Sequence, residues 1–379
     1  MTEISTTSSI GACWPPQVTT QERIRGFYTD GAVTTPEQLD EFADHWHNAA
    51  QQLGEEATRL SIRLVTTPDS LRELEDRAVR VEAAMPLTLP TRSGEAPTEY
   101  VLAYTGTNAS TRRGNDILPP EVDQTPLPTP TPHGILWRWQ QGSPDGPPYR
   151  ATVFHNLTDR DRGYHRDYQQ ELRAAYARPL QELYEPFGYD LVDTRELLDN
   201  PNNFIVIMQD SEGRPVSTAM AEVVEIAVDG LEPLVLAEIT EASTRPELRG
   251  QGLYRRASGL LISMLATDLD PGLTPIVYGE CNTNMPGVLQ AARQNHRRFA
   301  ALDADRYGPE FSLEARLAAG RLPFGLLEQN FRVEDGVVGQ NGRSYNDFAV
   351  SYVPHSVLEA EREAYARQQR EQRFVSSVR

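Results

Sequence analysis

Residues 236–254 read LAEITEASTRPELRGQGLY, and this stretch decides the fold. The first part alternates apolar and polar residues and is rich in β-branched side chains, which predicts a strand over Leu234–Thr244. Two glycines follow, Gly250 and Gly252, and an amphipathic helix pattern begins directly after them. A strand, a glycine turn and a helix start together form a cradle of backbone amides that can bind phosphate.

The spacing of the turn excludes two common phosphate-binding motifs. The P-loop requires Lys and then Ser or Thr after its last glycine, and the dinucleotide fingerprint requires three glycines where this window holds two. The turn does resemble the coenzyme A pyrophosphate loop of the GNAT acyltransferase superfamily, whose pattern is Arg or Gln, two residues, Gly, one residue, and Gly or Ala. Arg249 and Gly252 match this pattern, whereas Tyr254 departs from it at the last position.

Four arginines surround the turn in a chain of 379 residues with a formal net charge of -18. They are Arg245, Arg249, Arg255 and Arg256. Because a helix N-terminus already favours negative charge, the cluster indicates an anion site, with a solvated helix start as the alternative. The overall acidity argues against a nucleic-acid or anionic-membrane partner.

The predicted elements extend the resemblance over residues 150–355. In order, the patterns indicate a helix, a hairpin, the strand and its turn, a helix, a strand, a helix and a closing hairpin, which is the order of a GNAT domain. The predicted bounds are Arg166–Pro186, Asn203–Gln209, Val216–Val228, Leu234–Thr244, Leu253–Thr267, Pro275–Cys281, Met285–Ala300, Leu326–Val338 and Ser344–Val353. The expected fold class is therefore α/β (α+β), a mixed twisted sheet flanked by helices.

The remaining segments match no family, and composition divides them. We expect a disordered N-terminus at 1–20, an accessory α/β region at 21–105, a Pro-rich linker at 106–149 and a charged helical tail at 356–379. The accessory region holds two predicted helices that begin with Thr caps and two predicted strands. These are the helices Pro36–Leu60 and Pro68–Ala84 and the strands Ser61–Val65 and Tyr100–Tyr104.

The resemblance implies a slot where two parallel strands, Leu236–Thr244 and Pro275–Cys281, diverge. Acetyl-coenzyme A or another acyl-coenzyme A would lie there, with its pyrophosphate on the turn and its thioester carbonyl facing backbone amides. The matched segment looks most like the β-lysine N-acetyltransferase branch. The expected coenzyme-binding residues are Ala242, Ser243, Thr244, Arg249, Gly250, Gln251, Gly252, Leu253, Tyr254 and Asn284.

Three glutamates are candidates for the general base: Glu238 first, Glu241 second and Glu280 third. A carboxylate in a partly dry cleft has a raised pKa and can accept a proton from an amine. Strand alternation places the first two on opposite faces unless a bulge intervenes, as the resemblance implies. For each, a surface or salt-bridged carboxylate is the alternative.

The acid that would protonate the leaving thiolate is not assigned. Where many GNAT enzymes carry a Tyr, this chain has Ala291, so Tyr278, Tyr307 or Tyr345 could substitute, or the thiolate leaves unassisted. Cys281 could be a nucleophile, although a single strand cysteine is more often a buried apolar residue.

No metal site is expected. His45 and His47 are two apart on a predicted helix and point to nearly opposite sides. The two cysteines have no disulfide or metal spacing, which suits a cytoplasmic location. No apolar run reaches about 18 residues, so we expect no membrane span.

The expected function is acyl-coenzyme A-dependent transfer to a primary amine of a small cationic or amino acid-like molecule. Two alternatives stay open. One is a coenzyme A-binding regulatory module without catalysis, and the other is transfer of a non-acetyl group in a specialised pathway. The oligomeric state is not predicted.

Overall fold

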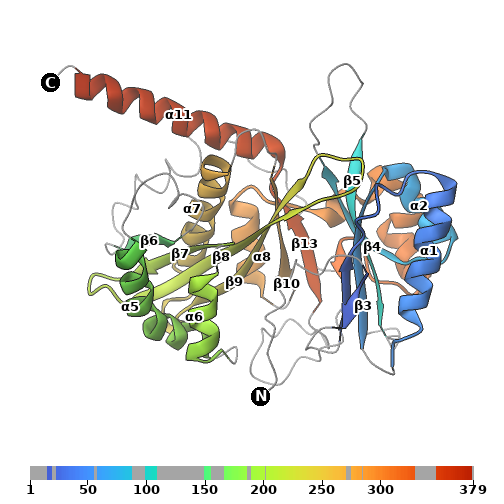
Figure 1. The fold of residues 1–379 in the computed structure, drawn as a ribbon, viewed down its shortest axis with the longest axis horizontal. Coiled ribbons are helices and arrows are strands. Elements are labelled where there is room, and N and C mark those ends of the chain that lie inside the picture. Colours follow the sequence, from blue (N-terminus) through green and yellow to red (C-terminus); the bar gives the residue numbers. More distant parts are fainter. Residues whose placement is uncertain are drawn as a thin grey trace.

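The computed structural model describes residues 15–18, 23–54, 58–87, 99–108, 149–154, 166–185, 189–200, 202–269, 275–283, 285–328 and 347–377. Within these ranges the chain forms two β-sheets and the helices that cover them (Figure 1). Most of the N-terminal segment predicted to be disordered and most of the Pro-rich linker fall outside the described residues, as do Asn284 and Tyr345, although residues 17–18 of that segment form a short strand.

The first sheet is formed by the accessory region and has the strand order β1-β2-β3-β5-β4. Its elements are β1 (Gln17–Val18), β2 (Arg23–Phe27), α1 (Pro36–Ala50), β3 (Arg59–Thr66), α2 (Pro68–Asp76), β4 (Val81–Leu87) and β5 (Tyr100–Asn108). Strands β2 and β3 are parallel, and the other pairs are antiparallel. Helices α1 and α2 cover its outer face, at the right of Figure 1.

Both predicted helix starts in this region are confirmed, but both predicted ends are wrong. Thr35 and Gln38 form the expected capping box on α1, yet α1 stops at Ala50 and not at Leu60. Helix α2 stops at Asp76 and not at Ala84, since Ala78 has a φ of 59° and turns the chain back toward the sheet.

The second sheet contains the predicted GNAT segment and has the order β11-β13-β10-β9-β8-β7-β6, with β12 also paired to β13. Its strands are β6 (Arg150–Phe154), β7 (Asn203–Gln209), β8 (Pro215–Ile226), β9 (Leu234–Thr244), β10 (Ile276–Asn282), β11 (Arg298–Phe299), β12 (Leu326–Leu327) and β13 (Phe348–Tyr352). Strands β9 and β10 are parallel and joined through α7, whereas the other pairs are antiparallel.

Helices cover both faces of the second sheet. These are α5 (Arg166–Tyr184), α6 (Leu191–Asp199), α7 (Leu253–Asp268), α8 (Pro286–Gln294) and α11 (His355–Ser377). Helix α7 packs on the face that carries Val206 and Ala237, and α5 packs on the opposite face, which carries Ile205 and Met220. The predicted fold class, a mixed twisted sheet flanked by helices, is confirmed.

One prediction near the end of the chain needs correction, and another is described only in part. The helix predicted to reach Ala300 stops at Gln294, because His296 has a φ of 61° and Arg298–Phe299 pairs with β13 as strand β11. Of the predicted closing hairpin, the structure describes Leu326–Leu327 (β12) paired antiparallel with β13, while residues 329–346 lie outside the described residues.

The two sheets share one apolar core. Tyr104 and Leu102 of β5 pack with Leu236 of β9, Tyr278 of β10 and Val350 of β13. Figure 1 shows the first sheet between its own helices and the second sheet.

A segment between β11 and β12 also joins the two halves. It contains η4 (Ala300–Asp303), α9 (Ala304–Tyr307), η5 (Pro309–Phe311) and α10 (Leu313–Ala318). Its residues Tyr307, Phe311 and Phe324 belong to the core under α1 and α2. The segment 300–324 therefore packs with the accessory region. The boundaries predicted for a separate domain at 150–355 stay a prediction.

Candidate functional site

Strands β9 and β10 diverge, as the resemblance implies. Their paired residues end with Glu238 opposite Tyr278, although β9 continues to Thr244 and β10 to Asn282. Beyond this last pair the backbone of β9 is no longer bonded to β10. We call this opening the split, and the Glu238–Tyr278 pair its vertex.

The glycine turn lies after the open end of β9. Gly250 and Gly252 have φ values of 82° and 72°, a conformation that disfavours side chains. Gly252 is the N-cap residue of α7 and provides no side-chain hydrogen bond to the helix. A Cβ placed on Gly250 would meet nothing within 4 Å. The first amides of this sixteen-residue helix therefore have no side-chain cap, and the Arg255 guanidinium would lie 3.5 Å from a Cβ placed on Gly252, so amides and a cation gather where an anion would bind.

The arginines around the turn are partly engaged by other groups. Arg245 pairs with Glu182 at 3.2 Å and donates to the carbonyl oxygen of Pro215 at 2.8 Å. Arg255 Nη1 donates to Gln294 Oε1 at 3.2 Å. Arg249 is exposed, and its Nε donates to the Thr244 carbonyl oxygen at 3.4 Å.

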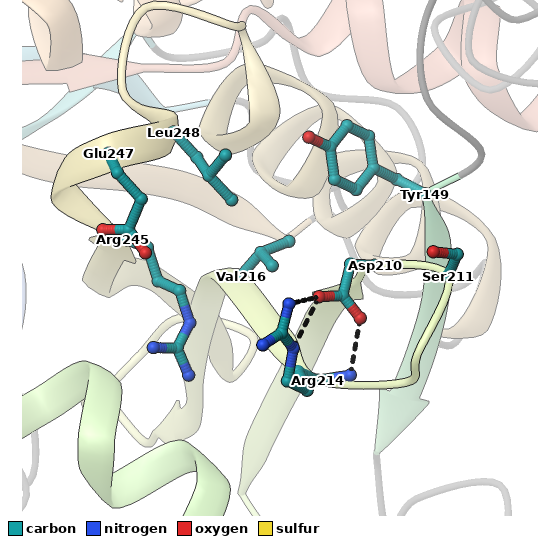
Figure 2. Close-up of a pocket in the computed structure, with 8 residues that line it drawn as sticks. All are labelled: Tyr149, Asp210, Ser211, Arg214, Val216, Arg245, Glu247 and Leu248. Carbon is teal, nitrogen blue, oxygen red and sulfur yellow. Dashed lines mark hydrogen bonds and ion pairs between the residues drawn. The ribbon is translucent and has the colours of Figure 1, made fainter.

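A pocket of about 240 Å³ lies on the outer side of the turn (Figure 2). Its lining includes Leu248 and Tyr149, and two acidic side chains, Asp210 and Glu247, lie in it with two arginines, Arg214 and Arg245. Asp210 and Arg214 form an ion pair at 2.8 Å inside it. Because these charges are already compensated, we assign no ligand to this pocket.

Several side chains of the predicted coenzyme site serve the fold. Ser243 Oγ donates to the Leu183 carbonyl oxygen at 2.8 Å, and Thr244 Oγ1 lies 2.7 Å from Ser217 Oγ. Leu253 is buried in the core under α7, and Gln251 accepts a hydrogen bond from Tyr149 at 3.0 Å. Ser243 and Leu253 are buried, so the backbone is the part of these two residues that can contact a coenzyme.

A bulge separates Glu238 from Glu241. The pairing of β8 with β9 shifts register between Thr218 and Met220, and Glu241 has a φ of 45°. Tyr189 donates to Glu241 Oε1 at 2.7 Å, and burial raises the pKa of the Glu241 carboxyl. Glu241 therefore lies beside α6, in surroundings separate from those of Glu238.

Glu238 and Glu280 meet at the vertex, together with an arginine from the first sheet. Arg63 Nη2 lies 2.9 Å from Glu280 Oε1 and 3.8 Å from Glu238 Oε2. Tyr278 donates to Glu238 Oε2 at 3.1 Å and accepts from Arg63 Nη1 at 3.0 Å. The Arg63 guanidinium also lies over the Tyr104 and Tyr278 rings, 5.0 and 5.6 Å from their centroids.

The pKa of the Glu238 carboxyl lies near neutrality. Burial, reinforced by the charge of Glu280, raises the pKa of Glu238 to about 7. The charges of Arg63 and Arg25 and the hydrogen bond from Tyr278 oppose this rise. A carboxyl balanced in this way is suited to accept a proton at neutral pH.

Sequence reasoning missed Arg63. It lies within a strand that is otherwise mainly apolar, RLSIRLVT, and a charged residue in such a run was the available signal. Its partners are more than 200 residues away along the chain, so no local pattern connects them.

Tyr254 points inward from the first turn of α7. Its phenol is hydrogen-bonded to Arg297, and burial raises its pKa to about 12, with the Arg297 charge acting against the rise. Cys281 is buried among apolar side chains, with its Sγ 3.6 Å from Ser351 Oγ. These surroundings favour the apolar interpretation of Cys281.

Neither a metal site nor a membrane span is found in the described residues. No group of three His, Cys, Asp or Glu side chains there could hold an ion. His47 Nε2 bonds the Arg77 carbonyl oxygen at 2.9 Å, a structural contact. None of the described helices combines the length and apolar character that crossing a bilayer requires.

Comparisons with known proteins give structural neighbours only. Neither the protein-family models nor the curated proteins contain a match. Arabidopsis thaliana NAA60 in complex with acetyl-CoA has a TM-score of 0.33 and 8% identity over 54% of this chain and 97% of its own. The ribosomal-protein-alanine N-acetyltransferase of Brucella melitensis has a TM-score of 0.23 and 13% identity over 31% and 72%.

A further neighbour is the aminoglycoside acetyltransferase meta-AAC0020, from an uncultured soil metagenomic sample, in complex with sisomicin. Its TM-score is 0.28, with 14% identity over 39% of this chain and 86% of its own. Because these scores are low, we infer the function from the topology and the geometry of the site.

Proposed function

We propose that this protein is an acyl-coenzyme A-dependent N-acyltransferase, with acetyl-coenzyme A as the default donor. One observation carries the proposal. The same split has a carboxylate with a pKa of about 7 at its vertex and an uncapped helix N-terminus beyond its open end. The first group can take a proton from an amine, and the second can bind a phosphate.

The residues present fit coenzyme A. The free amides at the start of α7 and the open space above Gly250 would accept the pyrophosphate. The unpaired backbone of β9 beyond Glu238 would accept the pantetheine amides as a neighbouring strand would. When bound, the acyl-coenzyme A supplies an acyl group activated as a thioester.

Glu238 acts as the general base in this proposal. Tyr278 donates to Glu238 Oε2 at 3.1 Å and so fixes the orientation of the carboxylate that would take the amine proton. Glu280 is engaged by Arg63, which supports Glu238 over Glu280 as the base. Glu241 lies across the bulge with Tyr189 and is better placed to contact another part of the acceptor.

The acceptor is, in our proposal, the primary amine of a small cationic or amino acid-like molecule. Support comes from Glu241, a second carboxyl of β9, which lies across the bulge from Glu238. Two acidic groups at this position favour a second positive group on the acceptor. The resemblance of the glycine-turn segment to β-lysine N-acetyltransferases points to the same class.

The test is release of free thiol from acetyl-coenzyme A across a panel of small amines. We expect activity whose rate rises with pH through a midpoint of about 7, as Glu238 loses its proton. Glu238→Gln should lower kcat/KM by about 10²- to 10⁴-fold. The matched control, Glu212→Gln, changes an exposed carboxylate in the β7–β8 turn and should leave the rate unchanged.

A coenzyme A-binding module without catalysis is the second candidate. It is favoured by Ala291 on α8, where an acid is expected by resemblance, and by the Arg63 ion pairs around the candidate base. Proven coenzyme binding with no turnover on any amine would favour it over the enzyme.

A further inference from the structure

Arg297 is a buried cation, and part of its guanidinium has no hydrogen-bond partner among the described residues. Its side chain follows α8 and is 1% exposed, yet Nε and Nη2 have no hydrogen-bond partner among the described residues. Burying charged N–H groups without partners costs free energy, so these two groups need an explanation, and a bound anion is one that would satisfy both. Nε and Nη2 form one edge of the guanidinium, the edge that binds anions side-on.

This edge lies at the vertex of the split. A Cβ on Gly279 would overlap Arg297 Nη2 and would stand 2.7 Å from the Ile239 carbonyl oxygen. Ile239 and Gly279 directly follow the last paired residues of β9 and β10. Because strand neighbours alternate in direction, Arg297 lies on the α7 face of the sheet, opposite Glu238.

Tyr254 connects this cation to the glycine turn. It is the second residue of α7, and its phenol bonds Arg297. Hydrogen-bonding groups therefore extend from the uncapped amides of α7, past the Tyr254 phenol, to the Nε–Nη2 edge of Arg297 at the vertex. A ligand whose phosphates lie on α7 and whose far end is anionic would match this arrangement.

We propose that Arg297, held by Tyr254, binds the sulfur end of coenzyme A and carries the negative charge of the departing thiolate. This rests on the proposed function. As the amine nitrogen forms its bond to the acyl carbon, the C–S bond breaks and sulfur keeps the electron pair. Glu238 takes the amine proton on the opposite face, and water protonates the thiolate after release.

The direct test is the pKa of the coenzyme A thiol while bound, followed by the ultraviolet absorbance of the thiolate. Bound to the wild-type protein, the thiol should titrate about one to three units below the free thiol. In Arg297→Met it should titrate near the free value, while Arg297→Lys should keep part of the shift. Desulfo-coenzyme A gives the absorbance baseline and should bind both proteins equally.

The affinity for coenzyme A provides a second test of the role of Arg297. At a pH where the bound thiol is ionised, Arg297→Met should weaken binding about tenfold or more. Gly279→Ala leaves Arg297 in the chain but displaces its guanidinium, so it should reproduce this loss.

Stability separates a ligand role from a structural one. Arg297→Met removes two donors that have no partner among the described residues and one hydrogen bond, to Tyr254, so its effect on the free energy of unfolding should be small. A large loss of stability in Arg297→Met would show a structural role and overturn the inference. So would an equal thiol pKa in both proteins. No coenzyme A binding by the wild-type protein would overturn the proposed function as well.

Discussion

The pKa of the Glu238 carboxyl depends on side chains from both sheets. Burial and Glu280 raise the pKa of Glu238, while Arg63, from the first sheet, opposes them. Because the opposing charge of Arg63 comes from the accessory region, that region takes part in setting the pKa of Glu238. It does more than cover the second sheet.

The raised pKa of Glu238 predicts a pH-dependent stability. Between its ordinary value of 4.5 and about 7, the folded protein holds a proton that the unfolded chain has lost. The stabilisation is therefore present at low pH and is lost as pH rises through about 7. Over this window Glu238 should reduce the unfolding free energy by about 3 kcal/mol.

Urea denaturation at several pH values, for the wild-type protein and Glu238→Gln, measures this contribution. The difference between the two stabilities should change across the window, since Gln does not titrate. Parallel curves would show that Glu238 has an ordinary pKa.

Arg63→Met should move the pH–rate profile. Without the guanidinium the pKa of Glu238 rises further, so the acidic limb of kcat/KM should shift upward by about one unit. Arg63→Lys should restore much of the original limb. As a control, Arg72→Met removes only the exposed ion pair with Glu310. A lower rate with an unmoved limb would mean that Arg63 acts only on the fold.

At the scale of elements, the glycine turn should be sensitive to a single methyl group. Gly250→Ala places a Cβ in a left-handed residue, which costs about 1 kcal/mol of stability. The same Cβ enters the space proposed for the pyrophosphate, so acetyl-coenzyme A affinity should fall by more than the stability loss explains.

Gly287→Ala provides the matched control for this change. Gly287 lies in α8, and a Cβ there meets nothing within 4 Å. The variant should be at least as stable as the wild-type protein and should bind the coenzyme normally. Equal affinities in the two variants would place the phosphate elsewhere.

Elements with strong local signals were predictable from the sequence. The bounds of β7 and β9 were predicted correctly because apolar runs end at turn residues on both sides. Residues 81–84, the first part of strand β4, were predicted as the end of a helix, since Glu82, Ala83 and Ala84 favour helix locally. They form a strand because β4 pairs with β5 and because Glu82 forms a buried ion pair with Arg59 of β3.

In the candidate site, too, only the parts with a local sequence signal were predictable. The glycine turn, the split and Glu238 follow from one continuous stretch and its resemblance to a known loop. Arg63 and Arg297 do not, because each acquires its place only when distant strands come together. Long-range packing, not propensity, decides where they lie.

At the scale of the whole molecule, the shared core predicts one cooperative unfolding transition. Leu236 lies in the core between the sheets, so Leu236→Ala should cost about 2–5 kcal/mol and shift the whole transition. Leu317→Ala, at a side chain 39% exposed, should have little effect. Calorimetry checks this, and two separate transitions with only one displaced would show independent domains.

The central claim is that the split and the glycine turn bind an acyl-coenzyme A. Calorimetric titration with acetyl-coenzyme A tests it most directly, using the wild-type protein and an Arg249→Ala, Gly252→Asp double variant. The variant removes a cation and adds a carboxylate at the helix N-terminus. We predict binding by the wild-type protein and its loss in the folded variant. A folded wild-type protein that binds no acetyl-coenzyme A, or a variant that binds it equally well, would contradict the claim.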